Sequence, residues 1–164
     1  MPARCASSGR SSAIIENSSF GGSSCRRLAP SPARIENFER LRAEKVKLAL
    51  ASSSDPKEVE AFIEILDIGE WIEGSTPAED AEHSKPDPEI FDAPLALIGS
   101  PKKRTGVVGD TPYDILAAHR IALPIFAVRC GGFEETLLQK AELIFDDVED
   151  LVRRFEEIDD SIRE

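Results

Sequence analysis

Two aspartates, Asp110 and Asp114, follow an apolar run at residues 105–108, with Gly109 between the run and the first carboxylate. A glycine lets the backbone turn sharply at the end of a strand. Carboxylates four residues apart supply oxygen ligands at fixed spacing for a hard divalent cation. We expect Asp110 to reach such a cation from the strand end. Asp114 has three open roles, which are to cap the following helix, to brace a lysine or to hold a metal-bound water.

A run of three serines, Ser52 to Ser54, follows a second short apolar segment at residues 45–51. A hydroxyl and free backbone N–H groups at a strand-to-helix turn form a seat for an anion, and the positive end of the helix dipole strengthens it. Ser52 and Ser53 are therefore candidate anion-binding residues. The simpler interpretation of the same serines is a helix cap.

A lysine, Lys85, stands in the segment Ser84-Lys85-Pro86-Asp87-Pro88. Two spaced prolines stiffen the backbone that follows the lysine, so its ammonium group could face an anion as a fixed point charge. The alternative is a solvated loop lysine before a helix that begins with a proline.

A fourth segment, Cys130-Gly131-Gly132-Phe133, follows another apolar run at residues 125–128. Consecutive glycines favour a tight turn. We interpret this loop as a plain turn, although it follows an expected strand directly, as Ser52 and Asp110 do.

Apolar runs that predict strands alternate along the chain with segments of helical spacing. We expect strands at residues 45–51, 71–74, 106–109, 125–128 and 143–145, and helices at 34–44, 56–66, 87–97, 113–119, 136–140 and 148–158. Asp55 and Pro56 suit the start of one helix, and Pro94 should shorten or kink another. This alternation predicts an α/β fold, a three-layer Rossmann-like parallel sheet with helices on both faces. Ligands of such sheets bind beyond the carboxyl ends of the strands, where Ser52 and Asp110 fall.

Charge is spread unevenly along the 164 residues, whose formal net charge is -11. Residues 1–45 carry +4 and residues 46–164 carry -15. The acidic part would repel a polyanion, which argues against nucleic-acid binding. The three cysteines are too scattered for a disulfide framework or a closely spaced zinc set, and they favour a reducing cytoplasm. No apolar run approaches the roughly 20 residues of a membrane span.

Residues 1–33 differ in composition from the rest, with nine serines and a single apolar cluster at residues 13–15. So little apolar surface cannot offset the ordering entropy of about 1–2 kcal/mol per residue. We expect a disordered or non-native extension at 1–33 and one domain at 34–164. Two weaker alternatives are a short strand at Ile14-Ile15 and an organelle targeting segment.

Three segments, in this order, resemble motifs of the haloacid dehalogenase-like hydrolase superfamily. KLALASSS resembles its second motif, SKPDPEIF its third and VVGDTPYD its fourth. The residues of these motifs are most similar to those of the phosphatase and phosphoglucomutase-like branch. The resemblance covers about residues 35–151.

The resemblance implies phosphoryl transfer through an aspartyl-phosphate with Mg²⁺. It implies that Ser52, with Ser53 beside it, holds a phosphoryl oxygen, and that Lys85 neutralises charge between phosphate and nucleophile. Asp110 would bind Mg²⁺ directly, and Asp114 would act through water or Lys85. Such preorganised charges stabilise an anionic transition state.

The first motif of that family, an Asp-x-Asp that supplies the attacking carboxylate, has no counterpart, because no aspartate precedes Asp55. The helical cap usually found before the second motif is also absent. In the family the first-motif strand lies between the strands that end here at Ser52 and Asp110, so we expect a sheet incomplete in its central strand. Three outcomes are open: Ile14-Ile15 fills the gap poorly, another chain donates a strand, or the sequence is an incomplete version of a gene.

The function expected from the resemblance is a Mg²⁺-dependent phosphoric-monoester phosphatase, inactive or nearly so without its nucleophile, with weak or absent Mg²⁺ binding. The alternative is a catalytically dead remnant that binds phosphate or a partner. The expected partners are a small phosphorylated metabolite and, through an open sheet edge, a strand-donating partner or a second copy. Neither nucleic acid nor membrane is expected.

Overall fold

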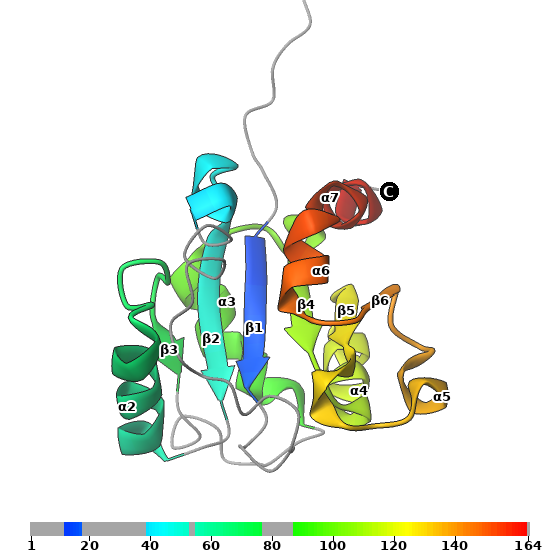
Figure 1. The fold of residues 1–164 in the computed structure, drawn as a ribbon, viewed down its shortest axis with the longest axis horizontal. Coiled ribbons are helices and arrows are strands. Elements are labelled where there is room, and N and C mark those ends of the chain that lie inside the picture. Colours follow the sequence, from blue (N-terminus) through cyan, green and yellow to red (C-terminus); the bar gives the residue numbers. More distant parts are fainter. Residues whose placement is uncertain (1–11, 18–38, 53–54, 77–86, 164) are drawn as a thin grey trace, which may run out of the picture.

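A single parallel sheet of six strands organises the protein, whose computed structural model describes residues 12–17, 39–52, 55–76 and 87–163 (Figure 1). The strand order is β3-β2-β1-β4-β5-β6, and every neighbouring pair is parallel. The strands are β1 (Ser12–Asn17), β2 (Lys47–Ser52), β3 (Ser75–Thr76), β4 (Thr105–Gly109), β5 (Ile125–Val128) and β6 (Leu143–Phe145).

Helices join successive strands and cover both faces of the sheet, α3 and α4 on one face and α6 and α7 on the other (Figure 1). The α-helices are α2 (Pro56–Leu66), α3 (Asp92–Ile98), α4 (Pro112–Arg120), α5 (Glu135–Leu138), α6 (Val148–Arg153) and α7 (Phe155–Arg163). The described residues also form the 3-10 helices η2 (Pro88–Phe91), η3 (Lys102–Arg104) and η4 (Arg129–Gly131). The α/β, three-layer fold predicted from the alternating pattern is therefore confirmed.

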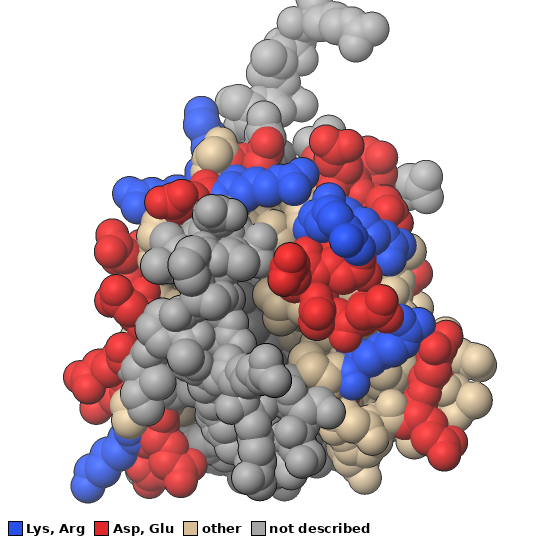
Figure 2. All heavy atoms as spheres, viewed as in Figure 1, with Lys and Arg blue, Asp and Glu red and all other residues tan. Residues whose placement is uncertain are grey.

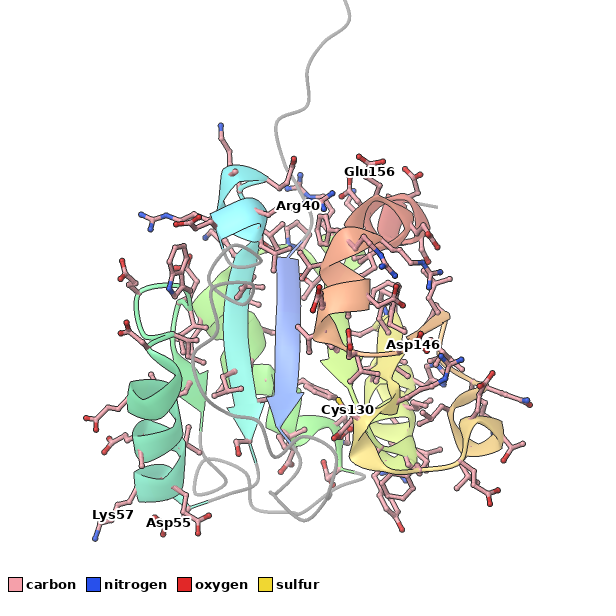
Figure 3. All side chains as sticks on the ribbon, viewed as in Figure 1. Arg40, Asp55, Lys57, Cys130, Asp146 and Glu156 are labelled. Atoms are coloured by element: carbon pink, nitrogen blue, oxygen red, sulfur yellow. The ribbon has the colours of Figure 1, made fainter. Side chains whose placement is uncertain are left out.

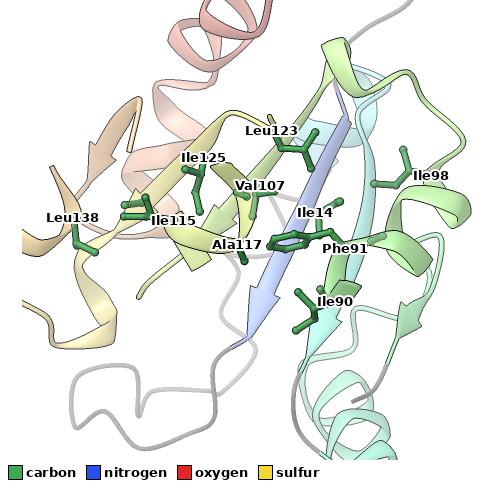
Figure 4. Packing of buried hydrophobic residues seen from close by; sticks show 14 residues of the cluster. Ile14, Ile90, Phe91, Ile98, Val107, Ile115, Ala117, Leu123, Ile125 and Leu138 are labelled. Carbon is green, nitrogen blue, oxygen red and sulfur yellow. The ribbon is translucent and has the colours of Figure 1, made fainter. Parts of the chain in front are cut away.

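Two hydrophobic clusters form the core, one on each face of the sheet. The first is centred on Ile14, Phe91 and Val107 (Figure 4). The second is formed by sheet residues such as Phe126 with the apolar faces of α6 and α7. Fully burying a side chain of this size contributes about 1.5–3 kcal/mol, so these clusters stabilise the sheet and the helices packed on it.

Strand β1 occupies the centre of the sheet, where we expected a gap; of the three outcomes left open, the structure shows the one in which Ile14-Ile15 fills it. It pairs with β2 from Ser12 to Asn17 and with β4 from Ser12 to Ile15. Ile14 is fully buried in the first cluster. Residues 12–17 are thus part of the sheet although the expected domain began at residue 34, and the gap that called for a donated strand is filled by this chain. The prediction from composition, a disordered extension, was wrong for residues 12–17. The strands on both sides bury this segment, which has too little apolar surface to fold alone.

Local signals determine several helix starts. Asp55 accepts a hydrogen bond from the Lys57 N–H at 2.9 Å and caps α2, at the end of the molecule where Figure 3 labels both residues. Asp87 caps η2 in the same way, through the Glu89 N–H at 3.1 Å. Pro94 does not end α3, because it lies in the first turn, where its missing N–H is not needed.

Two other expectations are wrong in detail. The strand expected at 71–74 is a two-residue strand at Ser75–Thr76 instead, and residues 71–73 form a turn. The single helix expected at 148–158 is two helices, α6 and α7, separated at Arg154. The helix expected at 34–44 is helical over 39–43, and its other half lies outside the described residues.

Arg154 joins the two C-terminal helices through ion pairs. Its guanidinium lies 3.4 Å from the Asp150 carboxylate in α6 and donates two hydrogen bonds of 2.8 and 2.7 Å to Glu157 in α7. It also lies over the Phe145 ring, 4.7 Å from the ring centre. Arg153 donates a further hydrogen bond to Asp150. The junction is thus held by charge as well as by the core.

These contacts shift two carboxyl pKa values. Burial acts to raise the pKa of Asp150, but the Asp146 N–H and the two arginines together outweigh it and hold that pKa below its ordinary value. The hydrogen bonds from Arg154 lower the pKa of Glu157. Carboxyls with depressed folded-state pKa values contribute stability above their unfolded pKa and lose it as pH falls through the folded pKa.

We expect the variant Arg154→Gln to be less stable than wild type at pH 7 but to lose less stability between pH 6 and about pH 3. Removing the guanidinium takes away the interaction that protonation of Glu157 and Asp150 would otherwise abolish in acid. Urea unfolding across this pH range measures the difference. Lys140→Gln, which removes an exposed cation elsewhere, should run parallel to wild type. Parallel curves for Arg154→Gln as well would contradict the assignment.

Candidate functional site

Three neighbouring strands end at one edge of the sheet and place two of the predicted residues, Ser52 and Asp110, at that edge. Ser52 is the last residue of β2, lies opposite Asn17 at the end of β1, and is fully buried. Asp110 follows β4 directly, on the other side of β1, and is half-buried. Since neighbouring strands lie about 4.8 Å apart, Ser52 and Asp110 stand on strands about 10 Å apart. Both lie at the sheet edge where parallel α/β sheets bind ligands.

Asp114 is turned inward and braces the loop that carries Asp110. Its Oδ2 accepts hydrogen bonds from the backbone N–H groups of Asp110 (3.2 Å) and Thr111 (2.9 Å) and from the Thr111 hydroxyl (2.8 Å). The Thr111 hydroxyl in turn accepts the Asp114 N–H at 3.2 Å, which completes a capping box at the start of α4. Asp114 has no exposed surface. Of its three open roles, the structure displays helix capping.

Gly109 is required by this arrangement for steric reasons. A Cβ atom at Gly109 would lie 2.7 Å from Asp114 Cβ and 2.8 Å from its Oδ2. Any side chain there would push Asp114 out of the capping box. The sequence suggested this glycine for a sharp turn. In the structure its missing side chain leaves the space into which Asp114 packs.

The end of β1 carries Glu16 and Asn17, opposite Ala51 and Ser52 respectively. This is the central position at which the family resemblance implies an Asp-x-Asp. The chain there reads Glu16-Asn17-Ser18. The strand that was expected to be missing is thus present, and its terminal residues differ in chemistry from the motif.

Two predicted residues, Ser53 and Lys85, lie outside the described residues, so their roles stay predictions. One residue that the sequence analysis passed over does contact the site. Gly131, in the loop interpreted as a plain turn, packs directly against Asp110. The signal for it was the placement of its loop after β5, at the same edge of the sheet.

One carboxylate in the described part of the site, that of Asp110, has the chemistry that Mg²⁺ prefers. Asp110 is the half-buried carboxylate at the strand end, whereas Asp114 Oδ2 already accepts three hydrogen bonds. Within residues 12–17, 39–52, 55–76 and 87–163, no three His, Cys, Asp or Glu side chains cluster as a metal site. Mg²⁺ commonly binds one or two carboxylates and completes its shell with waters and substrate phosphates. A single carboxylate therefore suits an ion that arrives with phosphate.

Comparison with known proteins identifies the class that this fold and edge define. Residues 20–128 match the family described as haloacid dehalogenase-like hydrolase, and the chain belongs to that family. The match begins beyond β1. The resemblance inferred from the three motifs is thereby confirmed.

Individual relatives agree with this assignment. The chain is 30% identical over 105 residues to a Caldanaerobacter subterraneus protein whose name, PpaX, assigns it to the pyrophosphatases; the match covers 64% of this chain and 48% of the relative. A hydrolase structure from Pseudomonas syringae superposes with a TM-score of 0.70 at 28% identity, over 78% of this chain and 62% of that one. A β-phosphoglucomutase structure from Thermotoga maritima, at 23% identity, shares the fold, with a TM-score of 0.68 over 78% and 60% of the two chains.

The chain spans about half the length of the curated relatives it matches. Among the helices that the structure describes, none is both long and apolar enough to cross a membrane.

Proposed function

We propose that this protein is a phosphatase-type hydrolase of the haloacid dehalogenase-like family whose pocket binds a small phosphorylated metabolite with Mg²⁺, and which turns it over slowly if at all. The observation that carries the proposal is the pairing of strand ends. Ser52 and Asp110 flank the end of β1, which carries Glu16 and Asn17 instead of an Asp-x-Asp.

Each residue has a chemical task in this proposal. The Ser52 hydroxyl donates a hydrogen bond to a phosphoryl oxygen, and Lys85 neutralises the phosphate charge with its ammonium group. Asp110 holds Mg²⁺. The Asp114 carboxylate fixes the Asp110 backbone, because it accepts a hydrogen bond from the Asp110 N–H. When bound, Mg²⁺ supplies positive charge to the phosphoryl oxygens. Binding and charge stabilisation are retained, while covalent attack lacks its aspartate.

The charge of the chain favours one class of ligand, and its cysteine content favours one cellular compartment. On the face drawn in Figure 2, carboxylates lie over α6 and α7 and around the rim, with arginines and lysines between them. With a net charge of -11, a small phosphate ester is a better ligand than a polyanion. Pyrophosphate belongs among the substrates to assay because of the names of the relatives. We place the protein in a reducing cytoplasm on its three scattered cysteines.

We expect Mg²⁺ and inorganic phosphate together to raise the Tm of the wild-type protein, and Asp110→Asn to abolish the rise. A ligand at about ten times its Kd stabilises by about 1.4 kcal/mol, which is roughly 3–6 °C for a domain of this size. The asparagine keeps the shape of the side chain but removes the charge that the cation needs. Thermal scans with each ligand alone and with both measure the effect.

Turnover separates the two forms of the proposal. Release of phosphate from p-nitrophenyl phosphate or pyrophosphate that Asp110→Asn abolishes would identify an active enzyme. Stabilisation without turnover would identify a phosphate-binding remnant. If the folded wild-type protein shows neither, the proposed pocket is wrong.

A further inference from the structure

Gly131 and Asp110 are in unusually close contact across the sheet edge. A Cβ atom at Gly131 would lie 2.9 Å from both Cβ and Cγ of Asp110, and closer still to its backbone oxygen. Real Cβ atoms essentially never approach other heavy atoms within 3.0 Å. The φ angle of Gly131 is not positive, so its backbone would accept alanine and the obstacle is steric.

The loop that carries Gly131 is held from behind. Cys130 packs against the second core cluster, and Figure 3 shows it near the ends of β4 and β5. Arg129 pairs with Glu135 of α5 at 2.9 Å and with Asp146 beyond β6. Because the two residues before Gly131 are both held, we expect crowding at Gly131 to displace Asp110.

Asp110 is held on its other side as well. Its backbone N–H donates to Asp114 Oδ2 at 3.2 Å, and Asp114 is itself locked in the α4 capping box. Asp110 therefore lies between the capped start of α4 and the loop that carries Gly131. Displacing a group in such a site by about 1 Å can cost about a hundredfold in function.

We propose that Gly131 is a positioning residue, which lets η4 pack against Asp110 and thereby fixes where that carboxylate meets Mg²⁺ and phosphate. The metal role of Asp110 in this inference rests on the proposed function. Supporting residues around metal ligands typically change metal affinity 10–100-fold when they are replaced.

The test compares Gly131→Ala with wild type, using Mn²⁺ as the probe and the electron paramagnetic resonance signal of free Mn²⁺ as the readout. We expect at least about tenfold weaker Mn²⁺ binding by Gly131→Ala. Gly69→Ala is the matched control, because its Cβ would meet only Ile63 Cγ2 at an ordinary 3.5 Å. That variant should bind Mn²⁺ as wild type does. Unchanged Mn²⁺ affinity in folded Gly131→Ala overturns the proposal.

A second readout separates this inference from the proposed function. If wild type does not bind Mn²⁺, the metal role of Asp110 is wrong. The amide ¹H–¹⁵N resonances of Asp110 and Thr111 then test whether Gly131 positions Asp110. They should shift in ligand-free Gly131→Ala and not in Gly69→Ala; no shift overturns the inference. If Gly131→Ala does not fold, Arg129→Gln loosens the same loop by removing exposed ion pairs that contribute little stability. It should shift the same resonances, and unchanged spectra would refute the role of the loop.

Discussion

The double substitution Glu16→Asp/Ser18→Asp is expected to raise hydrolysis of p-nitrophenyl phosphate by at least about a thousandfold, because it places a nucleophilic aspartate in the pocket that we propose. Glu16 is the penultimate residue of the central strand, one position before Asn17, which lies opposite Ser52. A glutamate carries its carboxylate one methylene further from the backbone than an aspartate does, and errors of about 1 Å cost about a hundredfold in such reactions. Initial rates with saturating Mg²⁺ measure the gain.

The matched control shifts both aspartates by one residue, as Asn17→Asp/Ser19→Asp. Successive side chains of a strand point to opposite faces, so we expect this pair to restore much less activity at the same net charge. Adding Asp110→Asn to the active pair should remove the gained activity. A folded Glu16→Asp/Ser18→Asp protein that stays as inactive as the shifted pair would show that the end of β1 does not stand where the nucleophile is needed.

Truncation of Ile14 is expected to destabilise the protein by about 2–5 kcal/mol as Ile14→Ala and by about 0.5–1.5 kcal/mol as Ile14→Val. Ile14 is fully buried at the centre of the first cluster, on a strand that is paired on both sides. The graded loss follows from the methyl groups removed and from the cavity left behind. Urea unfolding monitored by circular dichroism gives both values.

This prediction distinguishes a central strand from a loose N-terminal segment. Leu116→Ala, which truncates a side chain that is 44% exposed on α4, should change stability by no more than about 0.5 kcal/mol. If Ile14→Ala behaves like this surface control, residues 12–17 do not pack in the sheet. The site built on the end of β1 would then be lost with the strand.

The sequence predicted those parts of the fold whose cause is local. Strands β5 and β6 and helix α2 begin and end where expected, because both strands are continuous apolar runs and α2 starts at its own Asp55-Pro56 signal. The break at Arg154 was missed, because that residue joins two helices by pairing with carboxylates of each. Apolar spacing carries no information on such a junction.

The site divides in the same way. The placement of Ser52 and Asp110 at strand ends follows from their positions after apolar runs, and a parallel sheet brings such ends to one edge. The inward turn of Asp114 and the contact between Gly131 and Asp110 involve packing between the ends of different elements. The sequence left helix capping as one of three roles open to Asp114 and placed the Gly131 loop at the same edge of the sheet, but it did not indicate the contact between Gly131 and Asp110.

By itself, the sequence of this protein determined the parallel α/β architecture, the family and the edge at which chemistry could occur, since apolar runs, caps and motif order are written in consecutive residues. Only the tertiary structure decided that the serine-rich segment supplies the central strand and that a glycine loop packs against Asp110. Both depend on burial that distant parts of the chain provide. A six-residue strand whose apolar residues are confined to 13–15 gains that burial only when β2 and β4 pair with it.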